Sequence, residues 1–189
     1  MIAKAKMSKQ SAGLLLYRRG DSGLETAGKK ELGLGLEESG LEVFLIHPGG
    51  PFWAKKDLGA WSIPKGEYGP NGDHGDDEKP LAAALREFEE ETGFGEVGRL
   101  PESAFKALGS IRQIGGKVVT AWAVEFDVDA SKVISNFCEI EWPPRTCRRI
   151  SIPEVDRAAW FHMPEARNRI FAAQQPFLDR LIDLLAGRI

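Results

Sequence analysis

One segment near the middle of this 189-residue chain, PLAAALREFEEETG at 80–93, limits the possible folds more than any other. Pro80 suits the first turn of a helix, where its missing N–H and fixed φ cost nothing. An apolar stripe follows at positions i, i+3, i+4 and i+7, made by Leu81, Ala84, Leu85 and Phe88. The spacing predicts a helix over 80–92 that packs one face on a core and ends at Gly93.

Strand patterns lie on both sides of this helix. Short apolar runs bounded by turn residues predict strands at 11–19, 41–47, 104–114, 117–129 and 156–162, with a short extended segment at 61–63. Gly115 and Gly116 predict a two-residue hairpin turn. The stretch 131–151 has no regular pattern, and 164 to the end reads as helix with a break or kink at Pro176. The order predicts an α+β fold with a mixed central sheet flanked by helices.

Composition places the chain among ordinary globular proteins. It is 42% hydrophobic and 28% charged, and about 150 residues per domain predicts one domain over 1–189 with loop insertions at about 20–40 and 67–77. No apolar run approaches the roughly 18 residues of a membrane span, and the apolar stretch at 12–17 is too short for a signal peptide. We therefore expect a cytoplasmic protein without membrane contact, whose Cys138 and Cys147 stay reduced.

The net charge of −3 argues against a partner recognised by bulk electrostatics. Nucleic-acid-binding domains usually carry a basic excess or stripe, so we expect no DNA binding. A small anionic ligand remains compatible with this charge, since it needs only a local cation or a bound metal. The sequence does not define an oligomeric state, although a homodimer is possible.

The polar side of the predicted helix carries three carboxylates close together. Glu87, Glu90 and Glu91 stand at i, i+3 and i+4, where like charges repel by a few tenths of a kcal/mol per pair. They also lie toward the helix C-terminus, where the helix dipole disfavours anions. The arrangement suits a hard divalent cation such as Mg²⁺ or Mn²⁺, although a solvated acidic face is the commoner origin of such a run.

The flanking residues make the pattern more specific. Glu78 is followed, after seven residues, by the run 86–94, REFEEETGF. This resembles the signature of the Nudix hydrolases, G-x5-E-x7-R-E-U-x-E-E-x-G-U, at every specified position from Glu78 onward. We call this signature segment, Glu78 to Phe94, the box. Counting back by the family spacing, the signature glycine would fall on Gly72. The Pro-Lys-Gly turn before the box instead indicates Gly66, with about six residues inserted between that turn and Glu78.

The resemblance implies a Nudix-like α/β/α sandwich and a metal-dependent hydrolase. Such enzymes use Mg²⁺ or Mn²⁺ to cleave a pyrophosphate bond in nucleoside diphosphate derivatives. By position, Glu87, Glu90, Glu91 and the Gly66 carbonyl would be metal ligands. Arg86 would hold the carboxylates through a salt bridge, and Glu78 would lie near the ions. Glu90 and Glu91, together with Arg86, would carry the catalysis.

The general base stays open between a box glutamate and a carboxylate of the C-terminal half. Glu139 and Glu141 are the candidates there, and Glu141 is preferred. For the substrate, Lys65 and Arg145 are the predicted contacts, with Arg148 and Arg149 nearby in the sequence. Phe52, Trp53 and Tyr68 could stack on a base, whereas Trp61 and Trp160 suit a core better.

Three functions fit the resemblance to different degrees. A pyrophosphohydrolase acting on a nucleoside triphosphate or a dinucleoside polyphosphate is favoured, ahead of ADP-ribose, capped RNA or inositol pyrophosphates. A nucleotide-sensing module without hydrolysis is the alternative, but such a module would be expected to lose box residues. A scaffold with an accidental glutamate-rich helix agrees least with a nearly complete box.

Overall fold

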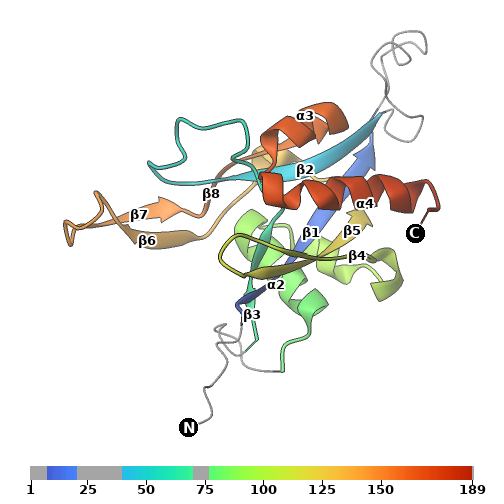
Figure 1. The fold of residues 1–189 in the computed structure, drawn as a ribbon, viewed down its shortest axis with the longest axis horizontal. Helices are drawn as coiled ribbons and strands as arrows, with labels where there is room; N and C mark the ends of the chain where they lie inside the picture. Colours follow the sequence, from blue (N-terminus) through green and yellow to red (C-terminus); the bar gives the residue numbers. More distant parts are fainter. Residues whose placement is uncertain (1–7, 21–39, 70–76, 189) are drawn as a thin grey trace.

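A computed structural model describes residues 8–20, 40–69 and 77–188 of the chain (Figure 1). The predicted insertions at 20–40 and 67–77 fall almost entirely outside these ranges. An exception is the start of the second one, because Glu67 and Tyr68 belong to a strand, β3 (Lys65–Tyr68), rather than to a loop.

A mixed sheet forms the centre of the molecule. Its order is β4-β5-β1-β2-β8, with β3 paired to β1. The strands are β1 (Gln10–Arg19), β2 (Leu41–Pro48), β4 (Lys106–Arg112), β5 (Val118–Glu125) and β8 (Val155–His162). β1 runs parallel to β5 and antiparallel to β2 and β3, so the predicted mixed sheet is confirmed.

The sheet is covered on both faces, which explains why the β1 sequence is an almost unbroken apolar run. Leu14 and Leu16 pack in one core with Phe88 of α2 (Pro80–Thr92). Leu15 packs in a second core with residues of α3 (Met163–Arg169) and α4 (Gln175–Leu185). Figure 1 shows α2 on one side of the sheet and α3 with α4 on the other, which is the expected α/β/α sandwich.

Three sequence expectations differ from the structure. The stretch 131–151, predicted as irregular, contains a two-stranded hairpin of β6 (Phe137–Glu141) and β7 (Arg149–Pro153). The β4–β5 turn has three residues between Gln113 and Lys117, whose backbones are hydrogen bonded, rather than two. The predicted strands around it are also shorter, since a 3-10 turn takes Glu102–Ala104 and the chain leaves the sheet after Glu125.

The C-terminal helical region is divided in a different place from the one predicted. α3 ends at Arg169, a 3-10 turn spans Ala172–Gln174, and Pro176 lies in the first turn of α4. The proline therefore begins a helix, the position it tolerates best, and does not break one. No helix in the described part of the chain is long and apolar enough to cross a membrane.

Candidate active site

The strand β3 and the helix α2 bring the predicted box residues together. Lys65 donates its backbone N–H to Glu91 Oε2 over 2.7 Å. The Glu87 carboxylate lies against Gly66, where a Cβ would stand only 1.7 Å from Glu87 Oε2. Only glycine leaves room for this carboxylate, which supports Gly66 as the box glycine on steric grounds.

Arg86 lies among three carboxylates. Its Nε and Nη2 reach the two oxygens of Glu78 over 2.9 and 3.0 Å, which is a bidentate pair. Its Nη1 also donates to Glu87 over 2.8 Å and to Glu90 over 3.3 Å. The guanidinium thus joins Glu78, two residues before α2 begins, to two acids on the helix, and these contacts raise the pKa of Arg86 further.

Burial makes the acids of this site costly to ionise. Burial raises the pKa of Glu91 to about 8, and the positive charge of Lys65 opposes that rise only in part. Burial also raises the pKa of Glu87, against the lowering effect of Arg86. Carboxylates in this condition gain stability from any cation that approaches them, because it favours their charged form.

Sequence reasoning did not single out Glu154, which the fold brings to the same place. Glu154 stands between β7 and β8, and its negative charge adds to the raised pKa of both Glu87 and Glu91. Its backbone bonds to Asn136 and Gly49. With the stretch 131–151 read as irregular, nothing in the sequence indicated that Glu154 lies between two strands, β7 and β8.

The residues present fit a hard divalent cation by their chemistry. All the candidate donors are oxygens, and the Glu87 carboxylate lies close to the Gly66 backbone. In the described ranges, however, no three acidic, histidine or cysteine side chains converge on one point that a metal could occupy. Glu87 and Glu90 contact Arg86 instead, and Glu91 contacts the Lys65 amide.

The remaining predicted residues lie in two places. Lys65 is next to the box, and its charge acts on Glu91. Glu141 and Arg145 belong to the β6–β7 hairpin, where Glu141 accepts a hydrogen bond from the Cys147 amide over 2.8 Å. Arg145 is exposed in the hairpin turn with a φ of 67°. Glu139 pairs with Arg149 across the same hairpin over 3.2 Å.

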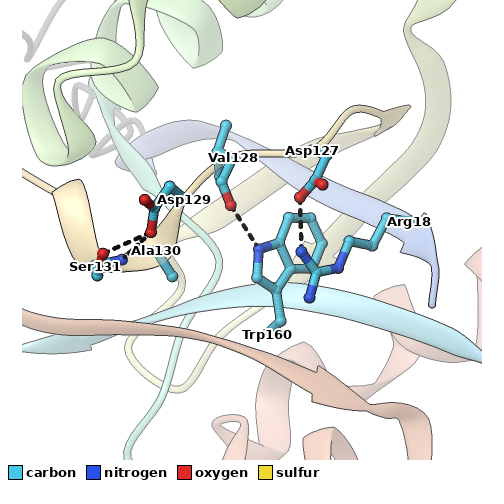
Figure 2. Close-up of a pocket in the computed structure, with 7 residues that line it drawn as sticks. All are labelled: Arg18, Asp127, Val128, Asp129, Ala130, Ser131 and Trp160. Carbon is cyan, nitrogen blue, oxygen red and sulfur yellow. Dashed lines mark hydrogen bonds and ion pairs between the residues drawn. The ribbon is translucent and has the colours of Figure 1, made fainter. Parts of the chain in front are cut away.

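Two of the surface cavities in the described part of the chain stand out, and neither is lined by the acids of α2. The larger, of about 480 Å³, lies beside Trp160 (Figure 2). Its charged groups are satisfied internally: Arg18 binds Asp127, and Asp129 accepts from Ser131. The second, of about 300 Å³, lies on the hairpin at Glu139, Glu141, Cys147 and Arg149.

Comparison with known proteins supports the family resemblance. The model of the NUDIX domain matches residues 34–181 of the chain. A solved structure of a C. elegans Ap4A hydrolase binary complex is similar at 20% identity and a TM-score of 0.53, over 94% of this chain and 98% of that one. The NUDIX domain of Shewanella oneidensis NrtR, complexed with ADP ribose, is similar at 15% identity and a TM-score of 0.57, over 95% and 90%.

At these identities the solved structures establish the fold alone, and no curated protein sequence matches the chain. The family match covers most of the chain, including β2, the box helix α2 and β8. An α/β/α sandwich whose helix carries Arg86, Glu87, Glu90 and Glu91 of the signature, together with the family match, defines the class as Nudix pyrophosphohydrolases, which generally use a divalent metal. The chain belongs to the Nudix family.

Proposed function

We propose that the protein is a Mg²⁺- or Mn²⁺-dependent hydrolase that cleaves a pyrophosphate bond in a nucleoside diphosphate derivative. A nucleoside triphosphate or a dinucleoside polyphosphate is the favoured substrate. The observation that supports this best is the contact between Glu87 and Gly66 beside Glu91, because it places two box acids on the backbone of the Pro-Lys-Gly turn.

Different residues of the chain would bind the metal, position the acids and attract the substrate phosphate. Glu87, Glu90 and Glu91, with the Gly66 carbonyl, would hold the metal. A bound divalent cation neutralises phosphate charge and acidifies a water molecule. Arg86 keeps Glu78, Glu87 and Glu90 close together through its ion pairs. Lys65, whose charge already reaches Glu91, is placed to attract a substrate phosphate.

The reaction adds one water across the P–O–P bridge. A new P–O bond forms between water and one phosphorus while the bond from that phosphorus to the bridging oxygen breaks. A carboxylate takes the proton of the attacking water, and the leaving phosphate departs with the bridging oxygen. We propose Glu154 for that proton, ahead of Glu141, since the charge of Glu154 acts on Glu87 and Glu91 while Glu141 is bonded within its hairpin.

Product analysis tests the proposal directly. Purified protein with Mg²⁺ is incubated with a panel of nucleoside diphosphate derivatives, including a nucleoside triphosphate, diadenosine tetraphosphate and ADP-ribose. Glu90→Gln serves as the control. Cleavage of one member that is lost in the control supports the proposal, and the products identify the broken bond.

Absence of cleavage by the wild type across the whole panel would contradict hydrolysis of these substrates. If Mg²⁺ or Mn²⁺ still raised the melting temperature in that case, the nucleotide-sensing module would become the better account.

A further inference from the structure

The segment 51–57 between β2 and the box turn carries an exposed aromatic and cationic group that the proposed chemistry does not use. We propose that this aromatic loop is the nucleobase subsite, in which Phe52 stacks on the base and Lys56 contacts the adjoining phosphate. The inference rests on the proposed function and adds to it the residues that select a nucleoside.

Phe52 is an exposed large apolar side chain, with 56% of its surface accessible. The Lys56 ammonium lies 3.4 Å from the centre of its ring and 4.7 Å from that of Trp53. Trp53 meets Phe52 edge to face at 4.8 Å. A nucleotide consists of a planar base next to an anionic phosphate. Proteins commonly bind nucleotides by stacking an aromatic ring on the base, with a cation nearby.

The loop is built to keep this arrangement before a ligand arrives. The Gly50 carbonyl accepts from the amides of Trp53 and Ala54, both over 3.1 Å, and Lys56 donates its amide to Trp53 over 2.7 Å. Trp53 packs on Phe171 at 5.3 Å. A loop whose aromatic is already in place gives up less conformational freedom on binding.

A buried histidine supports the loop from below. His47 is completely buried, and its ring joins the Lys56 carbonyl over 2.8 Å to Asp156 over 2.7 Å. The contact is to the backbone carbonyl of Lys56, so it does not engage the ammonium group. His47 therefore acts as a positioning residue for the loop.

The loop also begins at the carboxylate site. Gly49 donates its amide to the Glu154 carbonyl over 2.9 Å, and Glu154 is the acid whose charge acts on Glu87 and Glu91. Three residues span at most about 11 Å, so Phe52 lies within that reach of Gly49. Figure 1 shows the segment after β2 and the β6–β7 hairpin projecting from the same side of the sandwich.

The test separates the base from the phosphates. In a Glu90→Gln background, which prevents turnover, binding of ATP and of inorganic tripolyphosphate is measured by titration calorimetry with Mg²⁺. Phe52→Ala is expected to weaken ATP binding by roughly 5- to 100-fold and to leave tripolyphosphate unchanged, the range expected for loss of one stacked base. Lys56→Gln should weaken both ligands.

The matched control is Ile114→Ala, which removes a fully exposed apolar side chain at the β4–β5 turn and should change neither affinity. Equal loss of ATP and tripolyphosphate binding in Phe52→Ala, or no loss of ATP binding, would overturn the subsite, as would failure of ATP to bind the background protein. Hydrolysis by the wild type is scored separately: if it fails while ATP binding depends on Phe52, the proposed function falls and the subsite stands.

Discussion

At the scale of single residues, the site depends on the absence of one methyl group. A Cβ on Gly66 would overlap the Glu87 carboxylate, although the backbone at Gly66 does not require glycine for its conformation. Glycine is therefore needed at position 66 to leave room for the Glu87 carboxylate, and not for the chain to fold. This separation allows the role of Glu87 to be tested without loss of the fold.

We expect Gly66→Ala to displace Glu87 and lower activity at least tenfold, with a small effect on stability because the clash is with a movable side-chain end. Turnover and metal-dependent thermal shift are the measurements. Gly98→Ala is the control, since a Cβ there meets nothing within 4 Å. Full activity in Gly66→Ala would contradict the placement of Glu87 in the metal site.

Glu91 gives a second residue-level prediction. Its carboxylate is held in surroundings that disfavour its charge, while Oε2 accepts the Lys65 amide. Glu91→Gln keeps an acceptor for that amide and removes the charge, so the metal-free variant should melt at a higher temperature than the wild type. Mg²⁺ should stabilise the wild type but not the variant, and activity should fall by orders of magnitude.

Calorimetry with and without millimolar Mg²⁺ measures both effects together. Near-full turnover by Glu91→Gln would refute its assignment as a metal ligand. A variant less stable than the wild type without metal would contradict the account of its burial.

At the scale of elements, the segment 61–63 pairs with β2 through the backbones of Ser62 and Ile46, and one buried side chain supports it further. Gln174 is completely buried, and its Oε1 accepts from the Ile63 amide over 3.0 Å, while its Nε2 donates to Ser62. Gln174→Ala would leave that amide buried without a partner. We expect a loss of about 1–3 kcal/mol in the free energy of unfolding, measured by urea denaturation.

Gln174→Glu is the informative companion, because it retains an acceptor but places a charge in the core. It should be at least as destabilising at neutral pH as Gln174→Ala. A change within experimental error for Gln174→Ala would show that the segment is held by its backbone pairing alone.

The far end of the aromatic loop is fixed by an acid with a predictable pH response. Asp57 accepts from Trp61 Nε1 over 2.9 Å and pairs with Arg169 of α3; the Trp61 hydrogen bond is the main cause that lowers the pKa of Asp57. A lowered pKa in the folded state gives stability that is present above the ordinary value of 3.8 and is lost as pH falls through the folded value.

Below about pH 4, the melting temperature of Asp57→Asn should therefore fall less steeply with decreasing pH than that of the wild type. Near neutral pH, the two proteins should show a similar dependence of melting temperature on pH. Thermal scans between pH 2.5 and 7 measure it. Identical acid slopes in the two proteins would show that the Asp57 contacts add nothing to stability in solution.

The elements differ in how much of them the sequence could predict. The helix over 80–92 was predicted to the residue, because Pro80 and Gly93 end it by backbone chemistry that neighbours cannot change; Gly93 has the left-handed φ of 81°. The hairpin was missed although Cys138 and Ile140 alternate with Glu139 and Glu141, because the run is only five residues long and half-buried at most. Glu154 and the loop contacts depend on that hairpin, so they were beyond local reasoning.

At the scale of the whole molecule, the box helix has no sheet to cover without β1. This strand lies outside the family match at 34–181, yet it pairs with β2, β3 and β5 and is buried from Ser11 to Tyr17. Its alternate side chains enter both cores, as those of β2 also do, so β1 is one of the strands that join the two layers of helices. The candidate active site also depends on β1, because Ala12 of β1 is the register partner of Gly66.

A chain that begins after Arg19 should therefore fail to fold, although it keeps every box residue. We expect no cooperative thermal transition in far-ultraviolet circular dichroism, rapid proteolysis and no metal response. Leu14→Ala in the full chain is the control: it should cost about 2–5 kcal/mol and keep a cooperative transition, because it leaves the strand pairing in place. If the shortened chain instead melted cooperatively near the wild-type temperature, β1 would not be required for the fold. The pairing of Ala12 with Gly66 would then not be what holds the Pro-Lys-Gly turn against α2.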